Sequence, residues 1–204
     1  MENLLKNHIG DKVSSWYQLH GRHNLPWRKN ITPYRIWISE IMLQQTQVNT
    51  AIDYFNKFMK RYPDLKSIKS AEEDEIYALW SGLGYYRRAS YIFRAKELIH
   101  KDFNGQMPDD FDSLLSLPGI GRSTAGAILS IAFKKPYPIL DANVKKVIAR
   151  IFHKNKFNEK EFWHLSENLL DKKDIFSYQQ RVCQLTCHYH LKQQSSLFYF
   201  HLHY

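Results

Sequence analysis

Apolar residues recur every three or four positions along most of the chain, which is the spacing of amphipathic helices. Near the N-terminus this stripe consists of Leu5, Ile9, Val13, Trp16 and Tyr17. The sequence shows no sustained alternation of apolar and polar residues, which would be typical of strands, and no internal repeat. The pattern therefore predicts an all-α fold.

Turn-forming residues and capping signals divide the chain into separate predicted helices. The segment HGRHNLPWRKN is too rich in turn formers to be helical, whereas Pro33 suits the first position of the next helix. Ser70 and Glu73 fit a capping box at the start of another helix. The expected helices cover residues 33–45, 48–62, 71–80, 85–99, 109–117, 123–133, 143–152 and 161–170.

The charge balance indicates a polyanionic partner. Lys and Arg number 29 against 20 Asp and Glu, which gives a net charge of +9. Such an excess favours nucleic acid or an acidic membrane surface. No apolar run has the length of a signal peptide or a membrane span, so we expect a cytoplasmic protein. With two cysteines only, Cys183 and Cys187, neither a disulfide framework nor a two-pair zinc site is expected.

The stretch LPGIGRSTAGAI, residues 117–128, predicts a tight turn between two helices. The glycines permit backbone angles that side chains forbid, and Pro118 helps to end the preceding helix. Main-chain N–H groups at the turn and at the start of the next helix suit a phosphate. The alternative is an ordinary helical hairpin in which glycine serves close packing.

Glu40 interrupts the apolar segment RIWISEIMLQQ and shares a helix face with Trp37, Ile41 and Gln44. Desolvation there would raise the pKa of the Glu40 carboxyl group, which would allow it to act as a general acid near neutral pH. The alternative is a buried structural ion pair with an arginine, for example Arg88.

Asp141 precedes the predicted helix NVKKVIARIF. A carboxylate at a helix N-terminus accepts main-chain N–H bonds and stays ionised. Simple N-capping is the alternative to a functional role. Lys145 and Lys146, one turn further on, either contact phosphate or form a solvated face.

Five stretches together resemble one family. HGRHNLPWR, PYRIWISEIMLQQTQV, LWSGLGYYRRA, LPGIGRSTAGAI and PILDANVKKVIAR occur in this order and spacing in MutY-type adenine DNA glycosylases, of the helix-hairpin-helix base-excision superfamily. The resemblance extends from about Leu4 to Gln180. It implies a two-lobed helical fold, with a central lobe over 30–135 that ends in the hairpin. Residues 1–29 and 136–180 would form the second lobe, and 181–204 an aberrant tail.

The resemblance also implies an activity. Family members hydrolyse the N-glycosidic bond of adenine mispaired with 8-oxoguanine or guanine in double-stranded DNA. Glu40 matches the acid that protonates the adenine, and Asp141 matches the carboxylate that faces the sugar. A proton on the ring makes adenine a better leaving group, and a fixed carboxylate stabilises the positive charge on the sugar. The alternative is an inactive remnant that binds DNA only through its hairpin.

Further positions are assigned through the same resemblance. Ser123 replaces the lysine of endonuclease III-type glycosylase/lyases, and a hydroxyl cannot form their imine, so we expect a monofunctional enzyme. Gln45 resembles the residue that wedges into the space left by the extruded base, and Gln180 the residue that contacts that base. The expected DNA contacts are Gln44, Gln45, Gly119, Gly121, Arg122, Ser123, Thr124 and Lys145, and the carbonyls expected to hold an alkali ion are those of Leu115, Leu117 and Ile120.

The end of the chain departs from the family. The four cysteines that usually hold an iron–sulfur cluster would fall at His190, Leu197, Phe200 and beyond residue 204, so we expect no 4Fe-4S cluster. Cys183, Cys187 and the nearby histidines leave open another metal. The family's C-terminal domain, which reads 8-oxoguanine, is expected to be missing, and a frameshift near residue 181 is one hypothesis. We expect a monomer associated with the nucleoid.

Overall fold

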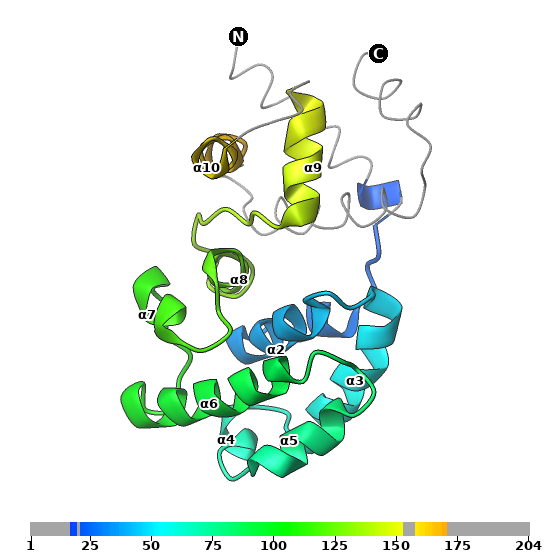
Figure 1. Cartoon of the computed structure of the whole chain (residues 1–204), viewed down its shortest axis with the longest axis vertical. Coiled ribbons are helices and arrows are strands. Elements are labelled where there is room, and N and C mark those ends of the chain that lie inside the picture. The colour runs from blue at the N-terminus through cyan, green and yellow to red at the C-terminus, as the bar shows by residue number, and fades with distance from the viewer. Residues whose placement is uncertain (1–16, 20, 153–157, 171–204) are drawn as a thin grey trace. The chain divides into compact units, whose positions relative to one another are not determined.

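The computed structural model describes residues 17–19, 21–152 and 158–170. Within these residues the chain is helical and contains no strand, so the predicted all-α class is confirmed. The chain divides into two compact units (Figure 1). The central unit is Asn24–Phe133, and the second unit consists of Met1–His23 and Lys134–Tyr204. Most of the apolar stripe near the N-terminus and all of residues 181–204 lie outside the described residues.

Helix α2 (Pro33–Leu43) lies at the centre of the central unit. Thr32 caps it by accepting a hydrogen bond from the Arg35 N–H at 3.2 Å, and Pro33 occupies its first turn as predicted. Four of its apolar residues are fully buried, namely Trp37, Ile38, Ile41 and Met42. The elements packed against α2 are η1 (Pro26–Arg28), α3 (Val48–Arg61), α6 (Arg87–Asp102), α8 (Arg122–Ala127) and η2 (Ile128–Ala132) (Figure 1).

Two short helices, α4 (Leu65–Ile68) and α5 (Glu73–Trp80), precede α6. The predicted capping box of Ser70 and Glu73 is wrong, because Glu73 is itself the first residue of α5. The box is two residues later: the Glu72 N–H donates to the Glu75 carboxylate at 3.1 Å. Arg61 also donates to that carboxylate at 2.8 Å, so a contact from α3 holds the residue that completes the cap.

The hairpin consists of α7 (Phe111–Ser116) and α8, joined by residues 117–121. The side chain of Asp110 caps α7 by accepting from the Ser113 N–H at 2.9 Å. The α-helix predicted over 123–133 is only half correct. After Ala127 the chain continues as the π-helical turn η2, in which the Phe133 N–H reaches back to the Ile128 carbonyl. This wider turn packs against α2.

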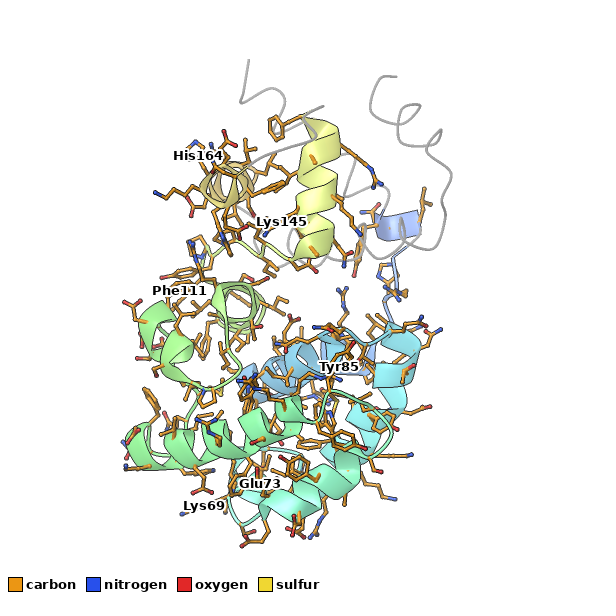
Figure 2. All side chains as sticks on the ribbon, in the orientation of Figure 1. Lys69, Glu73, Tyr85, Phe111, Lys145 and His164 are labelled. Carbon is orange, nitrogen blue, oxygen red and sulfur yellow. The ribbon has the colours of Figure 1, made fainter. Side chains whose placement is uncertain are left out.

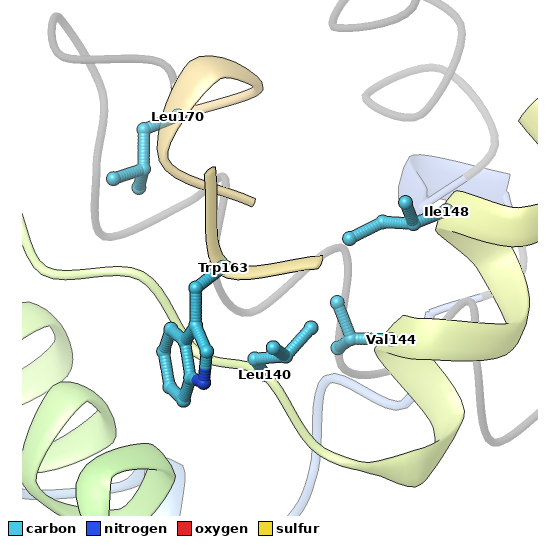
Figure 3. Close-up of a cluster of buried hydrophobic side chains, with 5 residues drawn as sticks. All are labelled: Leu140, Val144, Ile148, Trp163 and Leu170. Atoms are coloured by element: carbon cyan, nitrogen blue, oxygen red, sulfur yellow. The ribbon is translucent and has the colours of Figure 1, made fainter. Parts of the chain in front are cut away.

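The second unit contains α9 (Ala142–Ile151) and α10 (Glu159–Asn168), which pack together. A buried apolar cluster lies between them and consists of Leu140, Val144, Ile148, Trp163 and Leu170 (Figure 3). Helix α10 begins two residues before the predicted start because Asn158 and Glu161 form a capping box. The Ser166 hydroxyl donates to the Ile139 carbonyl at 3.3 Å and ties α10 to the segment that leads into α9.

Candidate functional site

Gly119 is required by the hairpin turn for two reasons. Its φ is +79°, in the left-handed region that residues with a side chain rarely adopt. A Cβ at this position would also lie 2.8 Å from the Cβ of Tyr91 on α6. The turn closes by a hydrogen bond from the Ile120 N–H to the Leu117 carbonyl at 3.2 Å. The local fold therefore accounts for Gly119 without any ligand.

Gly121 is different. It is the N-cap of α8 with φ −93° and ψ 177°, an extended conformation that any residue adopts. The expectation that both glycines supply forbidden backbone angles is therefore wrong for Gly121. A Cβ added there would meet no atom within 4 Å. Neither backbone conformation nor packing within the described chain requires a glycine, which leaves a bare, exposed strip of main chain at the start of α8.

The structure brings the end of α2 to the hairpin. The Gln44 side-chain amide donates to the Gly119 carbonyl at 3.5 Å, across 75 residues of sequence. Gln45, the next residue, is exposed and has a left-handed backbone with φ +56°. In the first turn of α8, Arg122 is exposed, Ser123 is half-buried and Thr124 is buried. The predicted contacts of the central unit thus gather around one turn.

Glu40 lies in the last two turns of α2 and is half-buried, between the fully buried Ile38 and Ile41. The alternative partner, Arg88, is not used in this way. Its guanidinium donates to main-chain carbonyls, among them those of Met42 at 2.7 Å and Gly84 at 3.0 Å. The ion-pair alternative with Arg88 is therefore wrong. The catalytic assignment of Glu40 stays a prediction.

Sequence reasoning missed the role of Arg88 at the end of α2. The side chain is buried, and burial lowers the pKa of its guanidinium group below the ordinary value. The run GYYRRA contains two adjacent arginines, of which Arg87 is exposed. Helical periodicity places Arg88 on the same face as the buried Ile92 and Ala95, and this is the signal that could have separated the two.

Asp141 is the N-cap of α9, as predicted. Its Oδ1 accepts from the N–H groups of Asn143 at 2.9 Å and Val144 at 2.7 Å. Its Oδ2 accepts a long contact, 3.5 Å, from the Asn143 side chain. The residue is exposed. One carboxylate oxygen is thus held by the start of the helix, while the other has a single long contact among the described residues.

Lys145 has an acidic neighbour that the sequence pattern did not reveal. Its Nζ lies 2.6 Å from Oε2 of Glu159 at the start of α10 and 5.8 Å from the centre of the Phe162 ring. A phosphate would have to compete with that carboxylate. Gln180, His190, Leu197, Phe200 and both cysteines lie outside the described residues, so the predictions on base contact and on the iron–sulfur cluster stay predictions.

The carbonyls proposed for an alkali ion suit a hard cation, which prefers oxygen ligands. The Leu117 carbonyl already accepts the Ile120 N–H, and a carbonyl oxygen retains a second lone pair. In the described part of the chain, no group of three or more His, Cys, Asp or Glu residues could hold a metal ion. Nor does any helix there have the length and apolarity needed to cross a membrane.

Comparison with known proteins identifies relatives that match most of the chain. An adenine DNA glycosylase of Buchnera aphidicola subsp. Acyrthosiphon pisum (strain APS) is 48% identical over 162 residues, which cover 77% of this chain and 46% of the relative. The Rattus norvegicus adenine DNA glycosylase is 37% identical over 185 residues, 84% of this chain and 36% of the relative. The chain thus spans about half the length, or less, of these relatives.

Solved structures show the same fold. A thermostable thymine-DNA glycosylase has a TM-score of 0.82 at 25% identity, covering 90% of this chain and 87% of that chain. A trapped endonuclease III–DNA covalent intermediate has a TM-score of 0.75 at 20% identity, covering 94% of this chain and 90% of that chain. The model of the HhH-GPD superfamily of base excision DNA repair proteins matches residues 38–172, well over half of the chain. The chain therefore belongs to the HhH-GPD superfamily of base excision DNA repair proteins, as its sequence motifs predicted.

Proposed function

We propose that this protein is a monofunctional DNA glycosylase that hydrolyses the N-glycosidic bond of adenine mispaired with 8-oxoguanine or guanine. The observation that carries the proposal is the 48% identity to a relative named adenine DNA glycosylase, together with a family match over residues 38–172, which include both candidate carboxylates. The second candidate, a DNA-binding protein without activity, is favoured by the departure of the C-terminal residues from the family pattern. The protein acts as a monomer in the cytoplasm, on nucleoid DNA.

In this proposal, Glu40 is the general acid. Adenine leaves poorly as an anion, so a proton delivered to its ring lowers the barrier to cleavage. The position of Glu40, half-buried between fully buried apolar residues of α2, supports this role, because partial desolvation favours the protonated form of a carboxyl group.

Asp141 stabilises the positive charge that develops on the sugar. Preorganised charge is effective because no dipole has to reorient during the reaction. The Asn143 and Val144 N–H groups hold the Asp141 carboxylate through Oδ1, which leaves Oδ2 for the sugar. The N-cap bonds and the electrostatic role are therefore compatible, and the capping alternative does not exclude catalysis.

DNA binding is assigned to the hairpin and to the positively charged side chains around it. Gly121 allows a phosphate to approach the main chain at the start of α8, because no side chain stands in the way. Arg122 adds an exposed positive charge beside it, and the net charge of +9 supports binding to a polyanion. An alkali ion on the carbonyls of Leu115, Leu117 and Ile120 would lend the turn a further positive charge.

The remaining assignments concern the extruded base. Gln45 enters the space that the base leaves, which suits an exposed side chain on a left-handed turn. Gln180 hydrogen-bonds the base itself through its amide, which both donates and accepts. Ser123 lacks the amine needed for an imine, so base removal proceeds without strand cleavage through that intermediate.

The test is single-turnover base removal from duplex DNA with adenine opposite 8-oxoguanine. Glu40→Gln and Asp141→Asn should each lower the rate on the order of 10²-fold or more, with duplex affinity and melting temperature largely unchanged. Asp64→Asn is the matched control, because Asp64 caps α4 through the same kind of bond, to the Ser67 N–H at 2.8 Å. Binding without base removal by the wild type would favour the inactive DNA-binding protein.

A further inference from the structure

One buried arginine holds the end of the central helix. The last carbonyls of an α-helix have no partner within the helix and are usually satisfied by water or by a turn. In α2 the Arg88 guanidinium from α6 donates to three of them, those of Ile41 at 3.1 Å, Met42 at 2.7 Å and Gln44. The same group donates to the Gly84 carbonyl at 3.0 Å. Arg88 thus joins the end of α2 to the loop before α6.

The residues that follow the held carbonyls share two unusual properties. Gln45 follows Gln44 and has φ +56°, and Tyr85 follows Gly84 and has φ +50°. Both side chains are exposed, and that of Tyr85, with 58% of its surface accessible, is among the most exposed large apolar side chains of the described chain (Figure 2). A left-handed backbone at a residue other than glycine is strained and persists only where its surroundings impose it.

The environment of Arg88 shows why an arginine is needed. Its guanidinium lies 5.4 Å from the centres of both the Trp80 and the Tyr85 rings, a distance typical of cation–π contact. A planar group with five donors can serve several carbonyls in a fixed geometry, which a lysine ammonium cannot do. Because only 5% of Arg88 is exposed, it is not placed to neutralise a DNA phosphate itself.

We infer that Arg88 is a positioning residue for base extrusion, which presents Gln45 to DNA by fixing the end of α2. The inference rests on the proposed function, in which Gln45 enters the space that the base leaves. It extends that function to a residue that acts only through others. Loss of Arg88 should therefore impair base extrusion while the number of phosphate contacts stays constant.

The experiment compares four variants of the full chain: Arg88→Lys, Gln45→Ala, the double variant, and Lys96→Met as a control. Lys96 is a second buried cation of α6, and it holds other carbonyls, those of Lys69 at 3.0 Å and Ala71 at 2.7 Å. The loss of Lys96 should lower the melting temperature without changing the position of Gln45. Base extrusion is followed by the fluorescence of 2-aminopurine placed at the target adenine, together with melting temperature and the salt dependence of duplex affinity.

Arg88→Lys should reduce the extruded fraction on the order of 10-fold. The double variant should lose no more base extrusion than the more impaired single variant, because both substitutions would prevent Gln45 from entering the DNA. The slope of log affinity against log salt should not change, and Lys96→Met should extrude the base like the wild type. Arg88→Gln, which keeps a planar two-donor group, replaces Arg88→Lys if the latter unfolds.

Three results would overturn the inference alone, given a wild-type chain that extrudes the base. The first is a double variant in which the losses of extrusion from the two substitutions multiply. The second is a slope of log affinity against log salt that falls by about one in Arg88→Lys, which would indicate a direct phosphate contact. The third is a loss of extrusion in Lys96→Met equal to that in Arg88→Lys. A wild-type chain that binds duplex DNA but extrudes no base would overturn the proposed function, and this inference with it.

Discussion

The two glycines of the hairpin provide a test that separates folding from DNA contact. Gly119→Ala and Gly121→Ala add the same methyl group two residues apart in one turn. At Gly119 the methyl group meets a left-handed backbone and the side chain of Tyr91. At Gly121 it meets an ordinary extended backbone and open space. If the start of α8 receives a phosphate, the two substitutions should affect different measurements.

The structure sets the size of each effect on stability. For Gly119→Ala, the left-handed conformation costs about 1–2 kcal/mol. The contact with the Tyr91 Cβ at 2.8 Å adds about 1–3 kcal/mol, because a Cβ is fixed to the backbone and cannot rotate away. For Gly121→Ala, a poorer N-cap is offset by the smaller entropy of the unfolded chain, so the net change should stay within about 0.5 kcal/mol.

The assays are urea unfolding and duplex affinity at fixed salt. Gly119→Ala should lower the free energy of unfolding by about 2–5 kcal/mol, the sum of its two costs. Gly121→Ala should keep that free energy and bind duplex DNA on the order of 10-fold more weakly, the loss expected when a hydrogen bond to a charged group is blocked. Wild-type affinity in a stable Gly121→Ala variant would refute close approach of a phosphate at this turn.

Further predictions concern trapping, salt and pH. Ser123→Lys should become trappable by borohydride on abasic DNA, whereas strong trapping of the wild type would exclude a monofunctional enzyme. Arg122→Ala should lower the salt slope of binding by about one, and Lys145→Ala by less, because Glu159 already neutralises Lys145. The hydrogen bond from Arg61 lowers the pKa of the Glu75 carboxyl group from its ordinary value of 4.5. The stabilisation from this bond is therefore present above pH 4.5 and is lost as the pH falls through the lowered pKa of Glu75. Glu75→Gln should therefore flatten the acid side of a melting-temperature curve.

Most helices could be predicted because local signals define them. The Thr32 cap followed by Pro33 fixes the start of α2, and the helical spacing of Phe55 and Met59 places α3. The start of α5 was misplaced because Ser70 and Glu73 match the usual capping-box pattern, whereas the observed box uses Glu72, which is not a typical N-cap residue, with Glu75. Arg61, from another helix, binds Glu75 and so supports the later pattern. The π-helical turn Ile128–Ala132 was not predicted, because its apolar residues continue the helical pattern of α8.

Within the site, features set by neighbouring residues could be predicted from the sequence, whereas features set by distant contacts could not. The N-cap role of Asp141 follows from its place before a helix and was predicted correctly. The different reasons for Gly119 and Gly121 could not be predicted, because the sequence does not show that Tyr91 lies against only one of them. Arg88, the example offered for an ion pair with Glu40, holds main-chain carbonyls instead, since sequence alone does not reveal which acceptors a buried arginine reaches.

The cations of this protein show why net charge predicts a class of partner but not a binding surface. Arg88 and Lys96 are buried and hold main-chain carbonyls, so their charges contribute to folding. Lys145 is paired with Glu159, and only by releasing that carboxylate could it serve a phosphate at full strength. Arg122 is exposed beside the bare main chain at Gly121. The part of the +9 charge that is available to DNA is therefore set by long-range contacts, which neither composition nor helical periodicity reveals.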